Sequence, residues 1–132
     1  MAKGRTVEGA ARMLTAHYRT NPTSMELCLC DSSGWSSPPT EAEITASIIA
    51  ETQGYTFQDV TPPADAVTNG TEAAITTADA SISVTSGTLN YSGWCIRRDG
   101  TEIEGYQSHD TKTLDSAAGA HSFSGIRLVA NV

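Results

Sequence analysis

The sequence has no apolar run near the roughly 20 residues that a membrane-spanning helix needs, and its opening residues lead into no signal-peptide core. It has only three cysteines, an odd number that does not fit a disulfide-stapled secreted domain. We therefore expect a protein that is made and kept in a cytosol. Its 132 residues suffice for one domain with its own hydrophobic core.

Basic residues are scarce, with 8 Lys and Arg against 15 Asp and Glu and a formal charge of −7. Binding of nucleic acid needs a positive face, so we expect no nucleic-acid partner. Four of the basic residues nevertheless fall within residues 1–20, a segment that contains only one acidic residue. This asymmetry suits a basic end that binds an acidic neighbour, including a copy of the chain, and the alternative is a solvated helix.

Catalytic motifs are missing as well. His17, His109 and His121 fall on a predicted helix face, a loop and a strand start, with no nucleophile motif around them. Glu102 and Glu104 share one face of a predicted strand, as a glycosidase pair would, but solvated edge charges that prevent sheet aggregation are the favoured interpretation. We therefore expect no enzymatic activity and no cofactor.

The cysteines are the one set of residues with metal-binding potential. Cys28 and Cys30 lie on the same side of a predicted strand, and Cys95 with His109 or His121 would complete four zinc ligands. The spacing is not that of a zinc finger or ribbon, so we interpret the thiols as small buried apolar side chains. We predict no metal.

Two helices are expected. Residues 7–19 carry apolar residues at helical spacing, with Thr6 as the N-cap. Residues 40–51 begin with Thr40-Glu41-Ala42-Glu43, which has the spacing of a capping box, and Gly54 ends this segment.

Strands account for most of the remaining chain, because Ser and Thr make up 32 of the residues and apolar positions alternate with polar ones. The predicted strands cover residues 25–30, 55–60, 73–75, 78–84, 91–98, 101–106, 112–114 and 126–132. The run 25–30 has few polar positions and should be buried on both faces. Asn69-Gly70 and Asp99-Gly100 predict tight turns. The result is a mainly β fold, a β-sandwich or flattened barrel of about seven short strands with an N-terminal helix and a short second helix.

Two other segments are candidates for contact with partners. Trp35 lies in the loop 31–39, where a local plug is favoured over a partner anchor. The strand 126–132 has one apolar face, to which Phe123 belongs if Gly125 forms a bulge. The candidate partner-binding residues are Lys3, Arg5, Arg12, Arg19, Trp35, Ile126, Leu128 and Val132.

The order of these elements has a counterpart in a known family. The elements concerned are the first helix, the strand 25–30, the segment from Thr40-Glu41-Ala42-Glu43 to Gly54-Tyr55, Val60, Asn69-Gly70, Ala73 to Ile75, and the Trp94 strand before Asp99-Gly100. Over about residues 8–106, this pattern resembles small bacteriophage virion proteins, variously labelled minor capsid, decoration or tail-fibre-like proteins. The resemblance implies a β-sandwich virion component without enzymatic activity, present in many symmetric copies.

We therefore expect a virion structural protein assembled in the host cytoplasm, with residues 1–6 as an ordered docking leader and 7–132 as a single β-sandwich-like domain. The first hypothesis is a capsid decoration or cement subunit that binds other virion subunits and copies of itself. The second is a tail, baseplate or fibre-attachment protein, whose exposed loops 32–39 and 105–110 face a receptor or another subunit. The third is a carbohydrate-binding module for a ligand such as a host-surface glycan. Its stacking platforms would be Trp35, Trp94, Tyr55 and Tyr106.

Overall fold

The structure is a computed structural model that describes residues 3–131. Two α-helices lie in this range: α1 (Val7–Thr15), which continues as a π-helical turn over Ala16–Thr20, and α2 (Glu41–Ser47). The strands are β1 (Met25–Cys30), β2 (Gln58–Asp59), β3 (Val67–Asn69), β4 (Glu72–Thr76), β5 (Ala80–Ile82), β6 (Thr88–Arg98), β7 (Glu102–Asp115), β8 (His121–Phe123) and β9 (Arg127–Asn131). Among the described residues, no helix combines the length and apolarity needed to cross a membrane.

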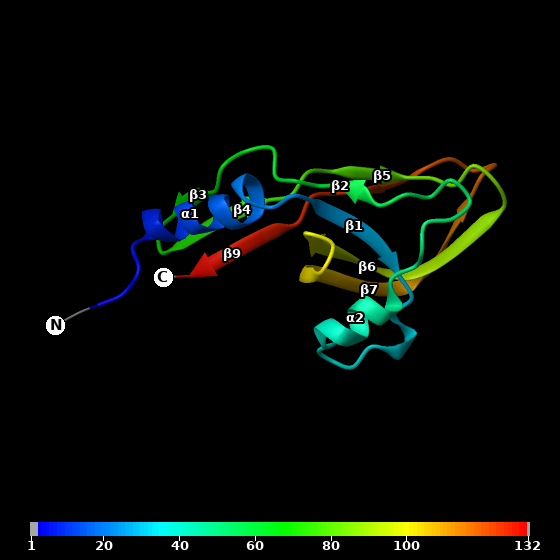
Figure 1. The fold of residues 1–132 in the computed structure, drawn as a ribbon, viewed down its shortest axis with the longest axis horizontal. Coiled ribbons are helices and arrows are strands. Elements are labelled where there is room, and N and C mark those ends of the chain that lie inside the picture. The colour runs from blue at the N-terminus through cyan, green and yellow to red at the C-terminus, as the bar shows by residue number, and fades with distance from the viewer. Residues whose placement is uncertain (1–2, 132) are drawn as a thin grey trace.

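The strands form three antiparallel sheets (Figure 1). The main sheet has the order β2-β1-β6-β7, the terminal sheet has the order β3-β4-β9, and β5 pairs with β8. The largest core joins the main sheet to β5 and β8, and α1 covers the terminal sheet at one end of the elongated molecule. The predicted mainly β fold with an N-terminal helix and a short second helix is confirmed, and residues 3–131 contain nine strands rather than about seven.

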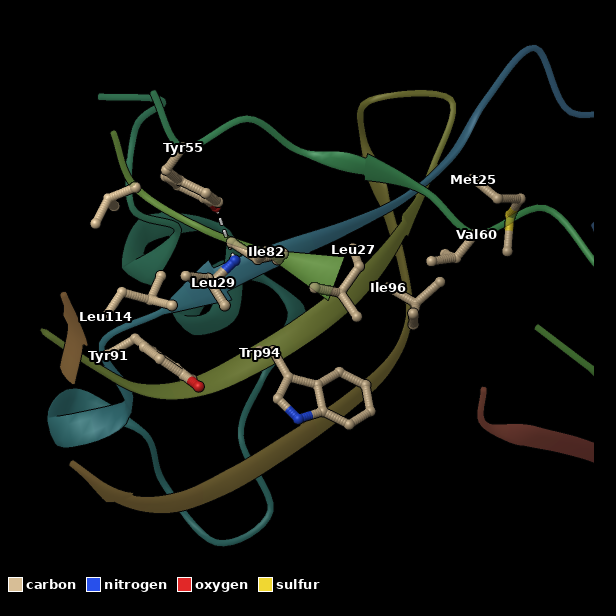
Figure 2. Close-up of a cluster of buried hydrophobic side chains, with 11 residues drawn as sticks. Met25, Leu27, Leu29, Tyr55, Val60, Ile82, Tyr91, Trp94, Ile96 and Leu114 are labelled. Carbon is tan, nitrogen blue, oxygen red and sulfur yellow. Dashed lines mark hydrogen bonds between the residues drawn. The ribbon is translucent and has the colours of Figure 1, made fainter. Parts of the chain in front are cut away.

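Strand β1 is the centre of the main sheet, as its composition predicts. Its odd-numbered residues, Met25, Leu27 and Leu29, enter the largest core, whereas Cys28 and Cys30 face α2 on the other side of the sheet. Both faces are therefore buried. Figure 2 shows the three apolar side chains of β1 among those of the neighbouring elements.

The longest strands, β6 and β7, form the predicted hairpin. Asp99 and Gly100 both have positive φ angles, 55° and 71°, and they form the centre of a tight turn closed by a hydrogen bond from Thr101 N–H to the Arg98 carbonyl oxygen. The Asp99 carboxylate also accepts hydrogen bonds from the backbone N–H of Thr23 and Ser24, at 2.6 and 3.3 Å. These bonds fix the hairpin tip beside the start of β1.

The terminal lobe consists of α1 and the sheet β3-β4-β9. Thr6 caps α1 by accepting a hydrogen bond from Gly9 N–H, as predicted. The helix buries its apolar stripe, which includes Leu14, against Ala73 and Ile75 of β4. Because the helix covers only one side of this three-stranded sheet, the other side stays open to contact.

Two predicted elements are shorter in the structure. The capping box at Thr40 and Glu43 is present, but α2 ends at Ser47 instead of residue 51. Its end is early because Ile48 adopts an extended backbone and forms a β-bridge with Cys30. Likewise, only Gln58–Asp59 of the predicted strand 55–60 pairs with β1.

The C-terminal strand differs more from the prediction. The chain from Phe123 onward is not one strand with a bulge, because β8 pairs with β5 and β9 pairs with β4. Gly125 lies at the crossing between the two sheets, where a Cβ atom would collide with the Thr77 carbonyl oxygen. Thr77 and Ile126 exchange hydrogen bonds there, so β4–β5 and β8–β9 cross together as a bent ribbon.

Candidate functional site

The outer face of the terminal sheet, turned away from α1, exposes a short apolar row. Val67, Ala74 and Val129 lie directly opposite one another on β3, β4 and β9. Val67 is 67% exposed and Val129 is 41% exposed, whereas Ala74 is covered between them. Strand β9 also has no neighbour on its second edge within the described range. An apolar row beside a free strand edge is the kind of surface that other chains bind.

Charge is divided between this lobe and the rest of the molecule. The terminal lobe, residues 3–20, 62–76 and 126–131, contains five basic and three acidic residues. The remainder of the chain, which we call the body, contains three basic and twelve acidic residues. The lobe therefore has a formal charge of +2 and the body one of −9, so the two regions carry net charges of opposite sign.

The predicted basic residues divide into two groups. Lys3, Arg5 and Arg12 are exposed on the lobe. Arg19 is instead used within the chain, because its Nη1 lies 2.7 Å from an Asp65 carboxylate oxygen and its Nε donates to the Pro62 carbonyl. Within the predicted leader 1–6, residues 3–6 are exposed and belong to no helix or strand, and the first two residues lie outside the described range.

The apolar residues predicted for partner contact are placed differently from the expectation. Leu128 packs against the cluster under α1, and Ile126 packs against the core of the main sheet. Val132 lies outside the described residues. The exposed apolar side chains on this lobe's outer face are instead Val67 and Val129. The sequence did not predict them, because the pairing of β9 with β4 decides which side of β9 is buried. The register of the β3–β4 hairpin, which places Val67 opposite Ala74, is the signal that would have located this face.

Trp35 lies half-buried over the second face of the main sheet. Its Nε1 donates a hydrogen bond to Ser47 Oγ at 2.9 Å, and its ring meets Tyr106 edge to face with centroids 5.8 Å apart. The favoured interpretation of Trp35 as a local plug agrees with these contacts. Together with Pro38 and Pro39 the two rings border a cleft of about 650 Å³.

The predicted loops 32–39 and 105–110 both contribute residues to this cleft, although the second is part of strand β7. Of the four predicted sugar-stacking residues, only Trp35 and Tyr106 lie together near the surface. Tyr55 and Trp94 are 1% and 7% exposed, so they belong to the core and are not stacking platforms.

Of the predicted pair of edge carboxylates, Glu102 is solvated as expected, with a side chain that is 53% exposed, but Glu104 is not. The Glu104 side chain is only 15% exposed and accepts hydrogen bonds from His17 and from the hydroxyl of Tyr18, at 3.0 and 3.1 Å. Burial, with the nearby Glu104 carboxylate, raises the pKa of Tyr18 to about 12. A β-bulge at Glu104 and the π-helical turn at His17 bring these side chains together.

His17, Glu102 and Glu104 place one potential metal ligand each within 4.8 Å of one another. Arg98 pairs with Glu102 at 3.1 Å, and its Nε donates to the His17 carbonyl oxygen. Each carboxylate therefore already has a partner from the chain, and the group joins the end of α1 to the β6–β7 hairpin.

The three cysteines are buried free thiols, as predicted. Cys28 lies directly opposite Cys95, and both pack with Cys30 beneath Ile44 of α2. The cluster has no histidine, because His121 lies in a different strand pair and bonds Tyr91. Comparison of the chain with protein-family models, curated proteins and solved structures found no match.

Proposed function

We propose that the protein is a non-enzymatic structural subunit of a bacteriophage virion, acting as a capsid decoration or cement protein. In this role the terminal lobe of one copy binds the acidic body of a neighbouring virion subunit, including another copy of the chain. The observation that carries the proposal is the division of charge between lobe and body, combined with the exposed apolar row on the same lobe.

The exposed basic residues of the lobe contribute more to the orientation of the two partners than to the affinity between them. Lys3, Arg5 and Arg12 are exposed, and an exposed ion pair stabilises a contact by about 1 kcal/mol or less. Opposite charges on two surfaces nevertheless direct an encounter and disfavour the reversed arrangement. A lobe of +2 facing a body of −9 thus favours head-to-tail contacts between copies.

The apolar row and the free strand edge supply the short-range contact. Burial of Val67 and Val129 beneath a neighbour removes apolar surface from water, which stabilises association. The edge of β9 offers backbone groups to a strand of another chain. Each contact is modest, but a shell repeats it many times, and the resemblance to small virion proteins points to such a multivalent setting.

Sedimentation velocity of the full chain tests this proposal. At about 0.05 M salt we expect species larger than the monomer to grow with concentration, and at about 1 M salt we expect mostly monomer, because salt screens exposed charges. Arg12→Gln should weaken association, whereas the matched control Lys112→Gln, which removes the same charge from the body, should not. A chain that stays monomeric at every concentration, or equal behaviour of the two variants, would contradict the proposal.

A second candidate function, receptor binding by a tail, baseplate or fibre-attachment protein, is supported by the Trp35–Tyr106 cleft. An exposed ring, Tyr106, and a half-buried one, Trp35, lie beside prolines and serines, which suits contact with a sugar or a peptide. A glycan array tests this function. Tyr106→Ala should abolish any saturable signal, whereas Val129→Ala, at an exposed site on the terminal lobe, should preserve it. An array without saturable binding would count against this function.

A further inference from the structure

A second cleft of about 650 Å³ lies on the opposite face of the main sheet from Trp35. Its walls come from β6, the edge strand β7 and β8, and its volume is within the range of small-molecule sites. The residues that matter for its chemistry are Tyr91, Trp94, His109, Lys112, His121 and Phe123. Tyr91 and Trp94 project from β6 on the core side (Figure 2).

One part of the wall is aromatic. Phe123 lies 6.1 Å from the Tyr91 ring and 6.3 Å from the Trp94 ring, measured between centroids. Tyr91 and Trp94 are 2% and 7% exposed and belong to the core, so the half-buried Phe123 is the ring against which a ligand ring can pack. The apolar part of the cleft is therefore shaped by three rings from two strands.

The other part of the wall carries hydrogen-bond donors. Tyr91 Oη lies 2.6 Å from His121 Nδ1. Burial raises the pKa of Tyr91, so the phenol keeps its proton. When this hydroxyl donates the hydrogen bond to Nδ1, the ring proton of His121 is on Nε2, which is then a donor. Lys112, which lies directly opposite Tyr91 across the strands, adds a positive charge to the same side.

His109 reaches this cleft because β7 is irregular there. The register of β6 and β7 shifts between Tyr91 and Gly93, so that His109, Asp110 and Thr111 of β7 lie opposite Ser92 alone, two residues more than regular pairing needs. The His109 ring packs edge-on to Tyr91 at 5.2 Å, and its Nδ1–H donates to the Asp110 carbonyl oxygen at 2.7 Å. Its Nε2 is buried and has no hydrogen-bond partner among the described residues. A bulge that re-aims a side chain is a common feature of binding sites.

The charge of the lining contrasts with that of the body. The body contains twelve acidic residues, yet no Asp or Glu among the described residues lines this cleft, which holds Lys112 and two histidines. Two carboxylates adjoin it. Asp79 accepts the Gly125 N–H, and Asp110 lines the Trp35 cleft on the other face. An acidic body with one cluster of donors and no lining carboxylate selects negatively charged ligands.

We propose that this cleft binds an organic anion in which a carboxylate or phosphate group is attached to a ring about the size of a monosaccharide. The anionic group contacts Lys112 and His121, the Nε2 of His109 accepts a hydrogen bond from a hydroxyl of the ring, and the ring packs on Phe123. This binding function is separate from the docking of the terminal lobe.

Isothermal titration of the full chain with four probes tests the proposal: glucuronate, glucose 6-phosphate, inorganic phosphate and glucose. We expect saturable binding of glucuronate, of glucose 6-phosphate, or of both, which also identifies the preferred anionic group. Glucose should not bind. Inorganic phosphate should bind at least about tenfold more weakly than the tightest of the ring compounds, because it lacks the aromatic contact.

Lys112→Gln should weaken binding of the best probe by about tenfold, since it removes a charged partner from the anion. Arg12→Gln, which removes the same charge from the terminal lobe, should leave the affinity unchanged. Lys112 is exposed, so loss of the fold is not expected, and a thermal melt of each variant checks this. Absence of saturable binding to either ring anion, equal binding of glucose, or equal effects of the two variants would overturn the proposal.

Discussion

Tyr55 joins the largest core to the backbone of the main sheet. It is among the largest fully buried side chains, and its hydroxyl accepts a hydrogen bond from Leu29 N–H at 2.9 Å. Burial is the main cause that raises the pKa of Tyr55, so the hydroxyl stays neutral under all ordinary conditions. A single buried hydroxyl thus satisfies a backbone group at the centre of β1 (Figure 2).

Tyr55→Phe should lower the free energy of unfolding by about 1–3 kcal/mol, because the Leu29 N–H is left buried without a partner. Urea unfolding followed by fluorescence measures the change. Tyr106→Phe, at a ring that is 46% exposed, is the matched control and should change stability by about 0.5 kcal/mol or less. Equal effects of the two substitutions would show that the Tyr55 hydroxyl is unimportant for the fold.

Glu43 makes stability depend on pH. Its carboxylate accepts hydrogen bonds from the backbone N–H of Thr40 and from the hydroxyl and backbone N–H of Ser36, and these bonds lower the pKa of Glu43 from 4.5 to about 2. Because the folded-state pKa is lowered, the contribution is fully present above pH 4.5, and it is lost as the pH falls toward 2.

Glu43→Gln should therefore lower Tm at pH 7, and the difference from the unmodified chain should shrink steadily as the pH is lowered to about 3. Thermal melts across this range measure it. Glu8→Gln is the control, because it removes a carboxylate from the first turn of α1 instead. Its Tm should differ less from that of the unmodified chain, and the difference should not follow the titration of Glu43. A Glu43→Gln difference that is constant with pH would rule out the lowered pKa.

At the scale of elements, the bent ribbon of β4–β5 and β8–β9 connects the main body to the terminal lobe. Gly125 permits the crossing because its missing Cβ leaves room for the Thr77 carbonyl oxygen. The ribbon therefore determines which side of β9 faces α1 and which side is exposed.

Gly125→Ala should destabilise the fold by about 1–3 kcal/mol or more, since the added carbon collides with backbone that has little freedom to move. Gly34→Ala is the control, because a Cβ at Gly34 meets nothing within 4 Å. Chemical denaturation of both variants measures the difference. Similar stabilities for the two would mean that the ribbon relaxes easily at this crossing.

Elements whose signals are local were predictable from the sequence. The caps at Thr6 and Thr40, the turn at Asp99-Gly100 and the doubly buried β1 all depend on neighbours within a few residues. The early end of α2 was not predictable, because it depends on a bridge to Cys30 from a distant part of the chain.

The candidate surfaces were predictable only in part for the same reason. The basic character of the N-terminal segment is visible in the sequence, but the pairing of Arg19 with Asp65 requires the folded chain. The exposed pair Val67 and Val129 comes from two strands that are far apart in sequence and adjoin the same central strand. The cleft around Tyr91 likewise depends on a register shift that no local pattern indicates.

At the scale of the whole molecule, charge and shape act together. The molecule is elongated, with its basic terminal lobe at one end, and the acidic body makes up the rest (Figure 1). A long molecule with separated charges favours contacts in which the lobe of one copy meets the body of the next. Under the proposed function, such contacts use different surfaces on the two partners, which is the arrangement that builds rings or extended arrays.

Zero-length crosslinking of carboxylates to amines, applied to a mixture of isotopically labelled and unlabelled chains, tests this arrangement most directly. The only lysines are Lys3 in the lobe and Lys112 in the body, so each link reports one of the two regions. We expect mixed-isotope links between Lys3 and carboxylates of the body, lost at about 1 M salt. Mass spectra that contain only links within one chain, or mixed links from Lys112 in place of Lys3, would contradict the account.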